Sequence, residues 1–191
     1  MIHLIFDTET TGLPKQYNAP MSDINNWPRL VQLSFIISDG NDSREFDFII
    51  KPDGFEISKE ATDIHGISQE QAMNDGVKLE YAMAIFRAMV NVADVIVAHN
   101  ITFDRAIVGA EYYRLGIGKS FEERLAEKEQ FCTMQKTTDM CKIPSQYGGN
   151  KWPKLIELYK HMFNEEFSGA HNSMVDTRAC AKCYFKLIKN K

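Results

Sequence analysis

The sequence contains few cysteines and no long apolar run, and both absences restrict the class of protein it encodes. Four cysteines in 191 residues are too few for a disulfide scaffold. Cys180 and Cys183 form a C-x-x-C inside a helical pattern, but no second pair at zinc-site spacing accompanies them, so we expect buried or half-buried thiols with no special role. No apolar stretch approaches the roughly 20 residues that cross a bilayer, and the first residues lack the pattern of a signal peptide. We therefore expect a cytoplasmic protein that makes no membrane contact.

Basic residues are also fewer than acidic ones. The chain carries 22 lysines and arginines against 26 acidic residues, a formal net charge of −4. This sign argues against a protein that coats long nucleic acid or reads duplex sequence, because such proteins neutralise many phosphates with basic side chains. It does not exclude an enzyme that holds a few nucleotides through metal ions.

The order of the predicted elements indicates an α/β fold. Apolar patterns predict strands at 2–7, 30–38, 44–50 and 95–98. Helical periodicity predicts helices at 78–92, 102–115, after Pro153 and at 173–189, with short helical signals over 57–72 and a charged helix over 121–131. Residues 131–141 fit a short strand or a further helix, and 14–28 and 142–152 are predicted loops. Early strands followed by alternating helices and strands are typical of an α/β layer fold, and the lack of repeats or linkers predicts one domain over 1–191.

Carboxylates occur where these patterns call for apolar residues. Side chains alternate along a strand, so Asp7 and Glu9 point the same way if the first strand continues that far. Asp104 shares a helical stripe with apolar residues, and Asp176 heads another such stripe in the last helix. Taken singly, each acid has an ordinary explanation as a helix N-terminal or turn residue. Taken together, they favour a shared metal site, because buried carboxylates need a cation.

The ligand type indicates which metal this site would hold. Carboxylate oxygens suit Mg²⁺ or Mn²⁺ better than zinc or copper. Two such ions can activate a water molecule and hold a phosphate between them. His171, five residues before Asp176, is the natural candidate for the general base that takes a proton from that water.

Several segments resemble the motifs of the DEDDh exonucleases, typified by the proofreading subunit of bacterial replicative DNA polymerase. Phe6-Asp7-Thr8-Glu9-Thr10-Thr11-Gly12-Leu13 looks like the first motif, and Ala98-His99-Asn100 through Phe103-Asp104 looks like the second. His171 followed by Asp176 resembles the third, with the histidine that marks this branch. The His65-Gly66-Ile67 segment and the 154–159 segment are also similar to the family pattern. The departures lie in the loops at 14–29 and 142–152.

The resemblance implies a ribonuclease H-like α/β fold, with a mixed central sheet flanked by helices, and a 3′-to-5′ exonuclease that releases nucleoside 5′-monophosphates. It implies that Asp7, Glu9 and Asp176 bind one metal ion, that Asp7 and Asp104 bind a second, and that His171 takes the proton of the attacking water. The residues that it assigns to the terminal nucleotide are Thr10, Thr11, Gly12, Leu13, His65, Asn100 and Phe103.

Three alternatives follow for the function. The form of the first motif resembles the proofreading branch more than the oligoribonuclease branch, so we expect the 3′ end of single-stranded or frayed DNA as substrate, with a DNA polymerase as a possible partner. An RNA-processing exonuclease with the same chemistry is the second reading. The third is an inactive nucleic-acid-binding module, which the presence of all four acids and the histidine disfavours.

Overall fold

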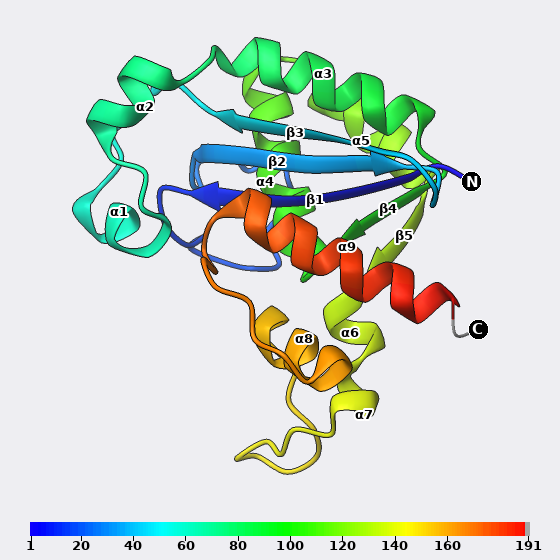
Figure 1. Ribbon diagram of the computed structural model, residues 1–191. Coiled ribbons are helices and arrows are strands. Elements are labelled where there is room, and N and C mark those ends of the chain that lie inside the picture. The colour runs from blue at the N-terminus through cyan, green and yellow to red at the C-terminus, as the bar shows by residue number, and fades with distance from the viewer. Residues whose placement is uncertain (190–191) are drawn as a thin grey trace.

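A mixed five-stranded sheet forms the centre of the computed structural model, which describes residues 1–189 (Figure 1). The strands are β1 (His3–Thr10), β2 (Leu30–Ser38), β3 (Ser43–Ile49), β4 (Val95–Ala98) and β5 (Glu129–Cys132), in the order β3-β2-β1-β4-β5. β2 runs antiparallel to β1 and β3, whereas β4 and β5 run parallel to β1. β1 therefore lies at the centre, between the antiparallel and the parallel half.

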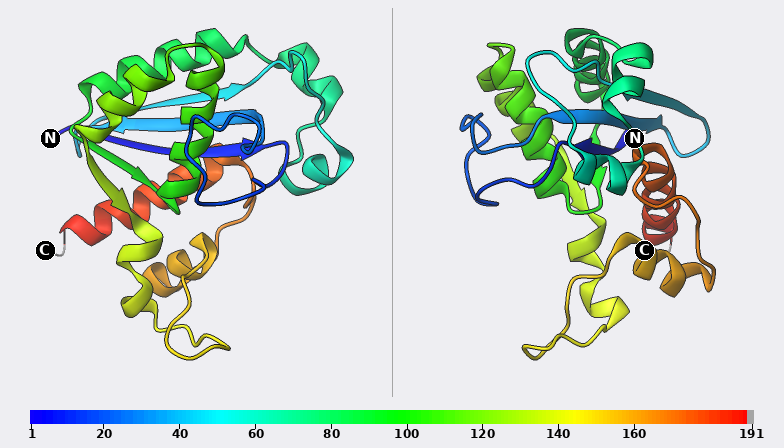
Figure 2. Two further views of the ribbon diagram at one scale, coloured as in Figure 1. Left: turned by 180° about the vertical axis from the view of Figure 1, so that it is seen from behind. Right: turned by 90° about the vertical axis from the view of Figure 1, so that its left-hand side faces the viewer.

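Helices cover both faces of the sheet (Figures 1 and 2). On one face lie α3 (Leu79–Val92), α4 (Ile101–Arg114) and α5 (Gly118–Ala126), and on the other lies α9 (Ser173–Lys189). The remaining helices are α1 (Lys59–His65), α2 (Gln69–Asp75), α6 (Thr133–Lys136), α7 (Thr138–Cys141) and α8 (Leu155–Phe163), of which α8 packs against α9. None of the helices within residues 1–189 combines the length and the apolar character needed to cross a membrane.

Alternation along β1 separates two hydrophobic cores. Leu4 and Phe6 pack with the layer of α3, α4 and α5, while Ile5 packs with α9, and all three side chains are fully buried. The same alternation decides where the polar residues further along the strand point. Asp7 and Glu9 continue the Ile5 side toward α9, and Thr8 continues the Leu4 side toward α4.

The predicted fold class is confirmed, and the errors lie at element boundaries. The first strand continues to Thr10, beyond the predicted end at residue 7, because β2 pairs with it along its whole length. The helix predicted over 121–131 ends at Ala126, and Glu129–Cys132 form β5. Four residues are too few for alternation to reveal that strand, which depends on parallel pairing with β4. Residues 131–141 hold the end of this strand and two short helices, so both readings were partly right.

Three of the four cysteine side chains are buried, as expected. Cys132, Cys180 and Cys183 are buried, Cys141 is half-buried, and all four are free thiols. Burial raises the pKa of Cys180 well above its usual range, so this thiol is inert at neutral pH. The thiols belong to the packing of the helices.

Candidate active site

Three carboxylates from the two ends of the chain meet at the carboxyl end of β1. One oxygen from each of Asp7, Glu9 and Asp176 can be chosen so that all three lie within 4.8 Å of one another. Asp7 and Glu9 share a face because the strand runs on to Thr10, and α9 brings Asp176 over that face. The predicted convergence of these three acids is therefore present in the structure.

The start of α9 is fixed to the sheet by a serine that the sequence analysis did not single out. The Ser173 hydroxyl donates to the main-chain carbonyl of Asp7 at 2.7 Å, and the Ser173 amide donates to Oε1 of Gln32 at 3.3 Å. Gln32 is buried and donates in turn to Asp47 at 2.8 Å. These bonds hold Asp176, one turn further along α9, against β1.

Asp104 reaches the same region from the opposite face of the sheet. Its Oδ1 accepts hydrogen bonds from the Thr8 amide at 3.1 Å and from the Thr8 hydroxyl at 2.8 Å. The side chain is 3% exposed, and its charge raises the pKa of Asp7. Asp104 is thus adjacent to the other three acids but lies outside the 4.8 Å group. Thr8, a polar residue on the buried side of an apolar strand, was the signal that could have predicted this contact.

The pKa of each of the four carboxylates is raised, and repulsion from neighbouring acids contributes for Asp7, Glu9 and Asp104. Burial is the largest cause for each acid, and it raises the pKa of Glu9 to about 8 and that of Asp104 to about 7. The pKa of Asp7 lies well above its usual range because of burial and the charges of Asp104, Glu9 and Asp176, while that of Asp176 is raised despite a hydrogen bond from His171. No lysine or arginine contributes to these shifts within the described chain. A set of oxygen donors without a cation fits one or more hard divalent ions.

His171 lies beside the acids, on the segment that leads into α9. Its amide donates to Oδ2 of Asp176 at 3.0 Å, and its backbone has a left-handed φ of 68°. This conformation is uncommon for a residue other than glycine, and here it aims the amide at the carboxylate. The imidazole is exposed to solvent next to the site.

The predicted residues for the terminal nucleotide form two groups. In the first, Thr11 is fixed by a pair of bonds to Arg29, and the Thr10 hydroxyl donates to the carbonyl of Gly12 at 2.7 Å. Leu13 follows, an apolar side chain with 74% of its surface exposed.

His65 belongs to this first group. It ends α1, its Nδ1 accepts a hydrogen bond from the Ile67 amide at 3.1 Å, and Gly66 supplies the left-handed turn with a φ of 80°. Burial lowers the pKa of His65, and the backbone of Thr10 partly offsets this effect.

The second group lies at the start of α4. Asn100 precedes the helix with a left-handed φ of 71°, and the Phe103 amide donates to its carbonyl at 2.9 Å. Both residues line a cavity of about 490 Å³. In the part of the chain that the structure covers, no hydrogen bond joins this group to the first.

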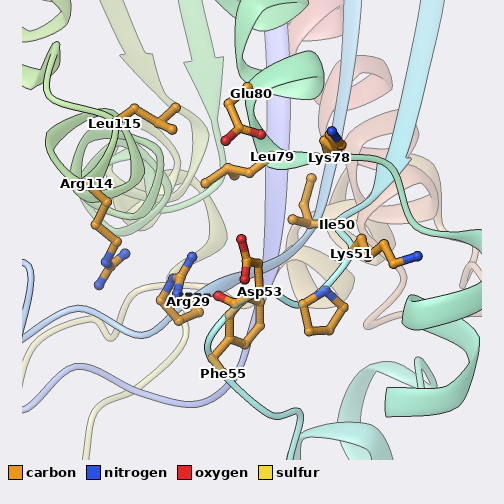
Figure 3. Close-up of a pocket in the computed structure, with 11 residues that line it drawn as sticks. Arg29, Ile50, Lys51, Asp53, Phe55, Lys78, Leu79, Glu80, Arg114 and Leu115 are labelled. Atoms are coloured by element: carbon orange, nitrogen blue, oxygen red, sulfur yellow. Dashed lines mark hydrogen bonds between the residues drawn. The ribbon is translucent and has the colours of Figure 1, made fainter.

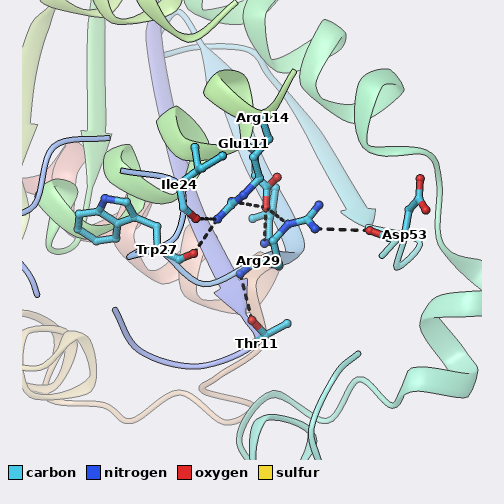
Figure 4. Close-up of polar contacts among 8 residues, drawn as sticks. Thr11, Ile24, Trp27, Arg29, Asp53, Glu111 and Arg114 are labelled. Carbon is cyan, nitrogen blue, oxygen red and sulfur yellow. Dashed lines mark hydrogen bonds and ion pairs between the residues drawn. The ribbon is translucent and has the colours of Figure 1, made fainter. Parts of the chain in front are cut away.

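A buried ion-pair network supports the Thr11 segment from behind (Figure 4). Glu111 is fully buried on α4, and its Oε1 accepts hydrogen bonds from Nε of Arg29 at 2.9 Å and from the Leu30 amide at 3.0 Å. Arg114 lies 3.0 Å from the same oxygen and donates to two carbonyl groups of the 14–28 loop. The sequence analysis missed this network, since its members are distant along the chain.

A cavity of about 460 Å³ lies beside the network (Figure 3). Arg29 borders it, with its guanidinium 4.3 Å from the centre of the Phe55 ring. Asp53 and Glu80 also line this cavity, but none of the four clustered acids does. It is therefore separate from the carboxylate site.

Comparison with known families gives a match over almost the whole chain. The family model RNase_T, described as Exonuclease, matches residues 4–184. The DNA polymerase III PolC-type of Staphylococcus saprophyticus is 26% identical over 188 residues, which cover 98% of this chain and 11% of the relative. The corresponding protein of Streptococcus sanguinis is 35% identical over 118 residues, 61% of this chain and 7% of the relative. The chain thus spans about a tenth of these curated relatives.

Solved structures share the fold. Exonuclease I of E. coli in complex with a dT13 oligonucleotide superposes with a TM-score of 0.77 at 19% identity, over 97% of this chain and 40% of that one. The same enzyme in complex with a dA16 oligonucleotide gives a TM-score of 0.77 at 19% identity, over 99% of this chain and 41% of that one. At this identity the similarity establishes the mixed sheet and its flanking helices.

Proposed function

Because this chain belongs to the exonuclease family, we propose that it hydrolyses the terminal phosphodiester at the 3′ end of DNA and releases nucleoside 5′-monophosphates one at a time. Residues 1–191 act in this proposal as a single exonuclease domain. The observation that carries it is the meeting of Asp7, Glu9 and Asp176, with Asp104 beside them, in a cluster whose pKa shifts receive no contribution from a lysine or arginine of the described chain.

The donor set assigns the acids to two divalent ions, Mg²⁺ or Mn²⁺. Asp7, Glu9 and Asp176 would hold one ion, and Asp7 with Asp104 would hold the second. Such ions neutralise charge on the reacting phosphate and lower the pKa of a water molecule. Repulsion from neighbouring acids contributes to the raised pKa of Asp7, Glu9 and Asp104, and bound cations would relieve it.

His171 is assigned the proton transfer. Its exposed imidazole borders the acids. The hydrogen bond from its backbone amide to Asp176 ties the position of the histidine to a residue that would hold the metal. A general base must come within hydrogen-bond reach of the proton that it removes, and it contributes typically about 10²- to 10⁴-fold in rate. His171 would take the proton from the attacking water while Asp176 stays ionised.

The two nucleotide-binding groups would hold the terminal residue of the strand. Thr10, Thr11 and Gly12 present backbone groups next to Glu9, and Leu13 supplies an exposed apolar side chain. His65 lies against the backbone of Thr10, and Asn100 and Phe103 lie at the start of α4, which carries Asp104. Positioning of this kind lowers the barrier because the reacting groups are already oriented.

The relatives favour DNA as the substrate. The curated relatives are DNA polymerases, and the structural relative was solved with single-stranded DNA oligonucleotides. We therefore assign a single-stranded or frayed DNA 3′ end to this chain, with RNA as the alternative that the assay below distinguishes. The similarity to PolC-type polymerases makes a polymerase the favoured partner.

Oligonucleotides labelled at the 5′ or the 3′ end test the proposal. With Mg²⁺ or Mn²⁺, the 5′-labelled DNA should shorten by single nucleotides, and the 3′-labelled DNA should release labelled mononucleotide at once. The Asp7→Ala variant should retain its circular dichroism spectrum and lose this activity. Release from the 5′ end, internal cleavage or equal activity of the variant would each reject the proposed activity. Faster hydrolysis of an RNA of matched sequence would make RNA the preferred substrate instead of DNA.

A further inference from the structure

Exposed aromatic side chains gather around the second nucleotide group. The cavity of about 490 Å³ is lined by Tyr17, Asn100, Thr102, Phe103, Gln135 and Trp152. Tyr17 is 58% exposed and Trp152 is 63% exposed, and the Tyr17 ring centre lies 6.5 Å from that of Phe103. Tyr17 and Trp152 belong to the loops at 14–28 and 142–152. The proposed function assigns no role to residues of these two loops. Large apolar side chains grouped in this way mark a binding surface.

The Tyr17 side of the cavity is held in place by a buried amide. Asn26 is 6% exposed, and its side chain accepts from the Gln16 amide at 2.7 Å and donates to the Gln16 carbonyl at 2.9 Å. Gln16 directly precedes Tyr17. The loop that carries this tyrosine is therefore a fixed wall of the cavity.

A half-buried histidine holds the Trp152 side of the cavity. Nε2 of His99 lies 2.9 Å from the carbonyl of Pro153, which can only accept, so Nε2 donates. Nδ1 then accepts from the Thr133 hydroxyl at 2.9 Å. Burial lowers the pKa of His99 to about 4, so the ring stays neutral and keeps both bonds at physiological pH. Pro153 directly follows Trp152, so the hydrogen bond to His99 joins the tryptophan's loop to the segment that leads into α4.

The lining of the cavity indicates the chemistry of its occupant. None of its six lining residues carries a formal charge: three are aromatic, two are amides and one is a hydroxyl. A planar ring with hydrogen-bonding edges suits such a site, because its faces stack on aromatic rings and its edges pair with amides. An isolated phosphate does not, since it would lose water without gaining a cation.

The position of the cavity connects it to the reaction site. Asn100, Thr102 and Phe103 place the cavity at the first turn of α4, the turn that also carries Asp104, the acid assigned to the second metal ion. Resting on the function proposed above, we propose that this cavity binds the unpaired nucleobase that directly precedes the terminal nucleotide, upstream of the scissile bond, between Tyr17 and Trp152, and that Phe103 contacts both nucleotides. The chain would thereby select single-stranded 3′ ends, since a base enclosed by these side chains has no room for its pairing partner. Stacking would replace the ionic contacts that a chain of net charge −4 does not supply.

Tryptophan fluorescence tests this binding without hydrolysis. The chain has two tryptophans, and Trp27 is 3% exposed with its indole bonded to Pro20, so only Trp152 can report a stacked base. In the Asp7→Ala background, a short single-stranded oligothymidylate should quench the emission with a saturable curve. The quenching should vanish when Trp152→Phe is added, while binding measured by anisotropy of a labelled oligonucleotide stays close to that of the parent. Absence of quenching in the parent would overturn the proposal.

Hydrolysis provides the second readout. Tyr17→Ala and Trp152→Ala should each raise KM for single-stranded DNA about 5- to 100-fold, as expected for loss of one stacked base. Tyr17→Phe should preserve the wild-type value. Tyr81→Ala, which removes an exposed tyrosine from α3, is the matched control and should leave KM unchanged.

Two further substrates separate this proposal from the one on which it rests. The p-nitrophenyl ester of thymidine 5′-monophosphate has no upstream base, so both alanine variants should hydrolyse it at the wild-type rate. A blunt duplex should show a smaller effect than the single strand. Loss on the ester, or an equal loss on the duplex, would overturn the stacking role. If the wild type hydrolysed nothing, the proposed function would fail, and the fluorescence result alone would decide whether the base site exists.

Discussion

Replacing Glu9 by glutamine should stabilise the metal-free protein at high pH and abolish its stabilisation by metal. The folded state raises the pKa of Glu9 from 4.5 to about 8, chiefly by burial and then by the charges of Asp176 and Asp104. A raised carboxyl pKa means that the folded state binds the proton more tightly than the unfolded state does. Its contribution to stability is therefore complete below about pH 4.5 and is lost as the pH rises to about 8.

The size of the effect follows from the same shift. One pKa unit corresponds to about 1.4 kcal/mol, so ionised Glu9 costs the metal-free folded state at most about 5 kcal/mol above pH 8. The glutamine amide also loses water on burial, at about 1–3 kcal/mol. We expect a net gain in the free energy of unfolding of about 2–4 kcal/mol at pH 9, and a net loss of up to about 2 kcal/mol near pH 5, where the wild-type carboxyl is protonated in the folded state and the cost of burying the amide dominates.

Urea unfolding followed by circular dichroism measures this difference. Wild type, Glu9→Gln and the exposed-site control Glu123→Gln would be compared in EDTA at pH 5 and pH 9, and again with Mn²⁺. With the metal the order should reverse, because the wild type gains an ion that binds only the folded state. A Glu9→Gln protein that is no more stable than the wild type in EDTA at pH 9 would refute the idea that uncompensated acids strain this site.

Three further predictions follow from the site and its supports. Mg²⁺ or Mn²⁺ should raise the free energy of unfolding of the wild type by about 2.7 kcal/mol at a hundredfold excess over Kd; an unchanged melting temperature at saturating metal would count against a preformed site. Glu111→Ala leaves Arg29 and Arg114 without their buried partner and should cost about 3–5 kcal/mol in urea unfolding, whereas a cost below about 1 kcal/mol would show that the network does not support the fold. His171→Gln should lower kcat about 10²- to 10⁴-fold with little change in melting temperature, since the imidazole is exposed; an unchanged kcat would remove His171 from the mechanism.

The sequence predicted the family, the α/β class and the central positions of the acids because these depend on local patterns. Leu4, Ile5 and Phe6 are apolar on both faces of β1, so the carboxylates that follow them stand out. The predicted placement of Asp7 and Glu9 on one face needed only the two-residue period of a strand. The family resemblance is confirmed by the model that matches residues 4–184.

What the sequence did not predict depends on contacts between distant residues. The hydrogen bonds from Thr8 to Asp104 join positions 96 residues apart, and those from Ser173 to the sheet join positions up to 166 residues apart. Tyr17 and Trp152 of the aromatic cavity come from two loops that the sequence showed only as departures from the family pattern, and its other lining residues come from the start of α4 and from α6. Such contacts arise from packing, which leaves no periodic signal along the chain. The roles assigned to the site residues stay predictions.

Crystals of the protein grown with Mn²⁺ test the central claim most directly, because anomalous scattering locates manganese without assumptions about ligands. The account predicts two anomalous peaks, one bounded by Asp7, Glu9 and Asp176 and the other between Asp7 and Asp104. Both peaks should disappear in crystals of Asp7→Ala. Manganese bound elsewhere, or none at all at saturating concentration, would contradict the claim that these acids form a metal site.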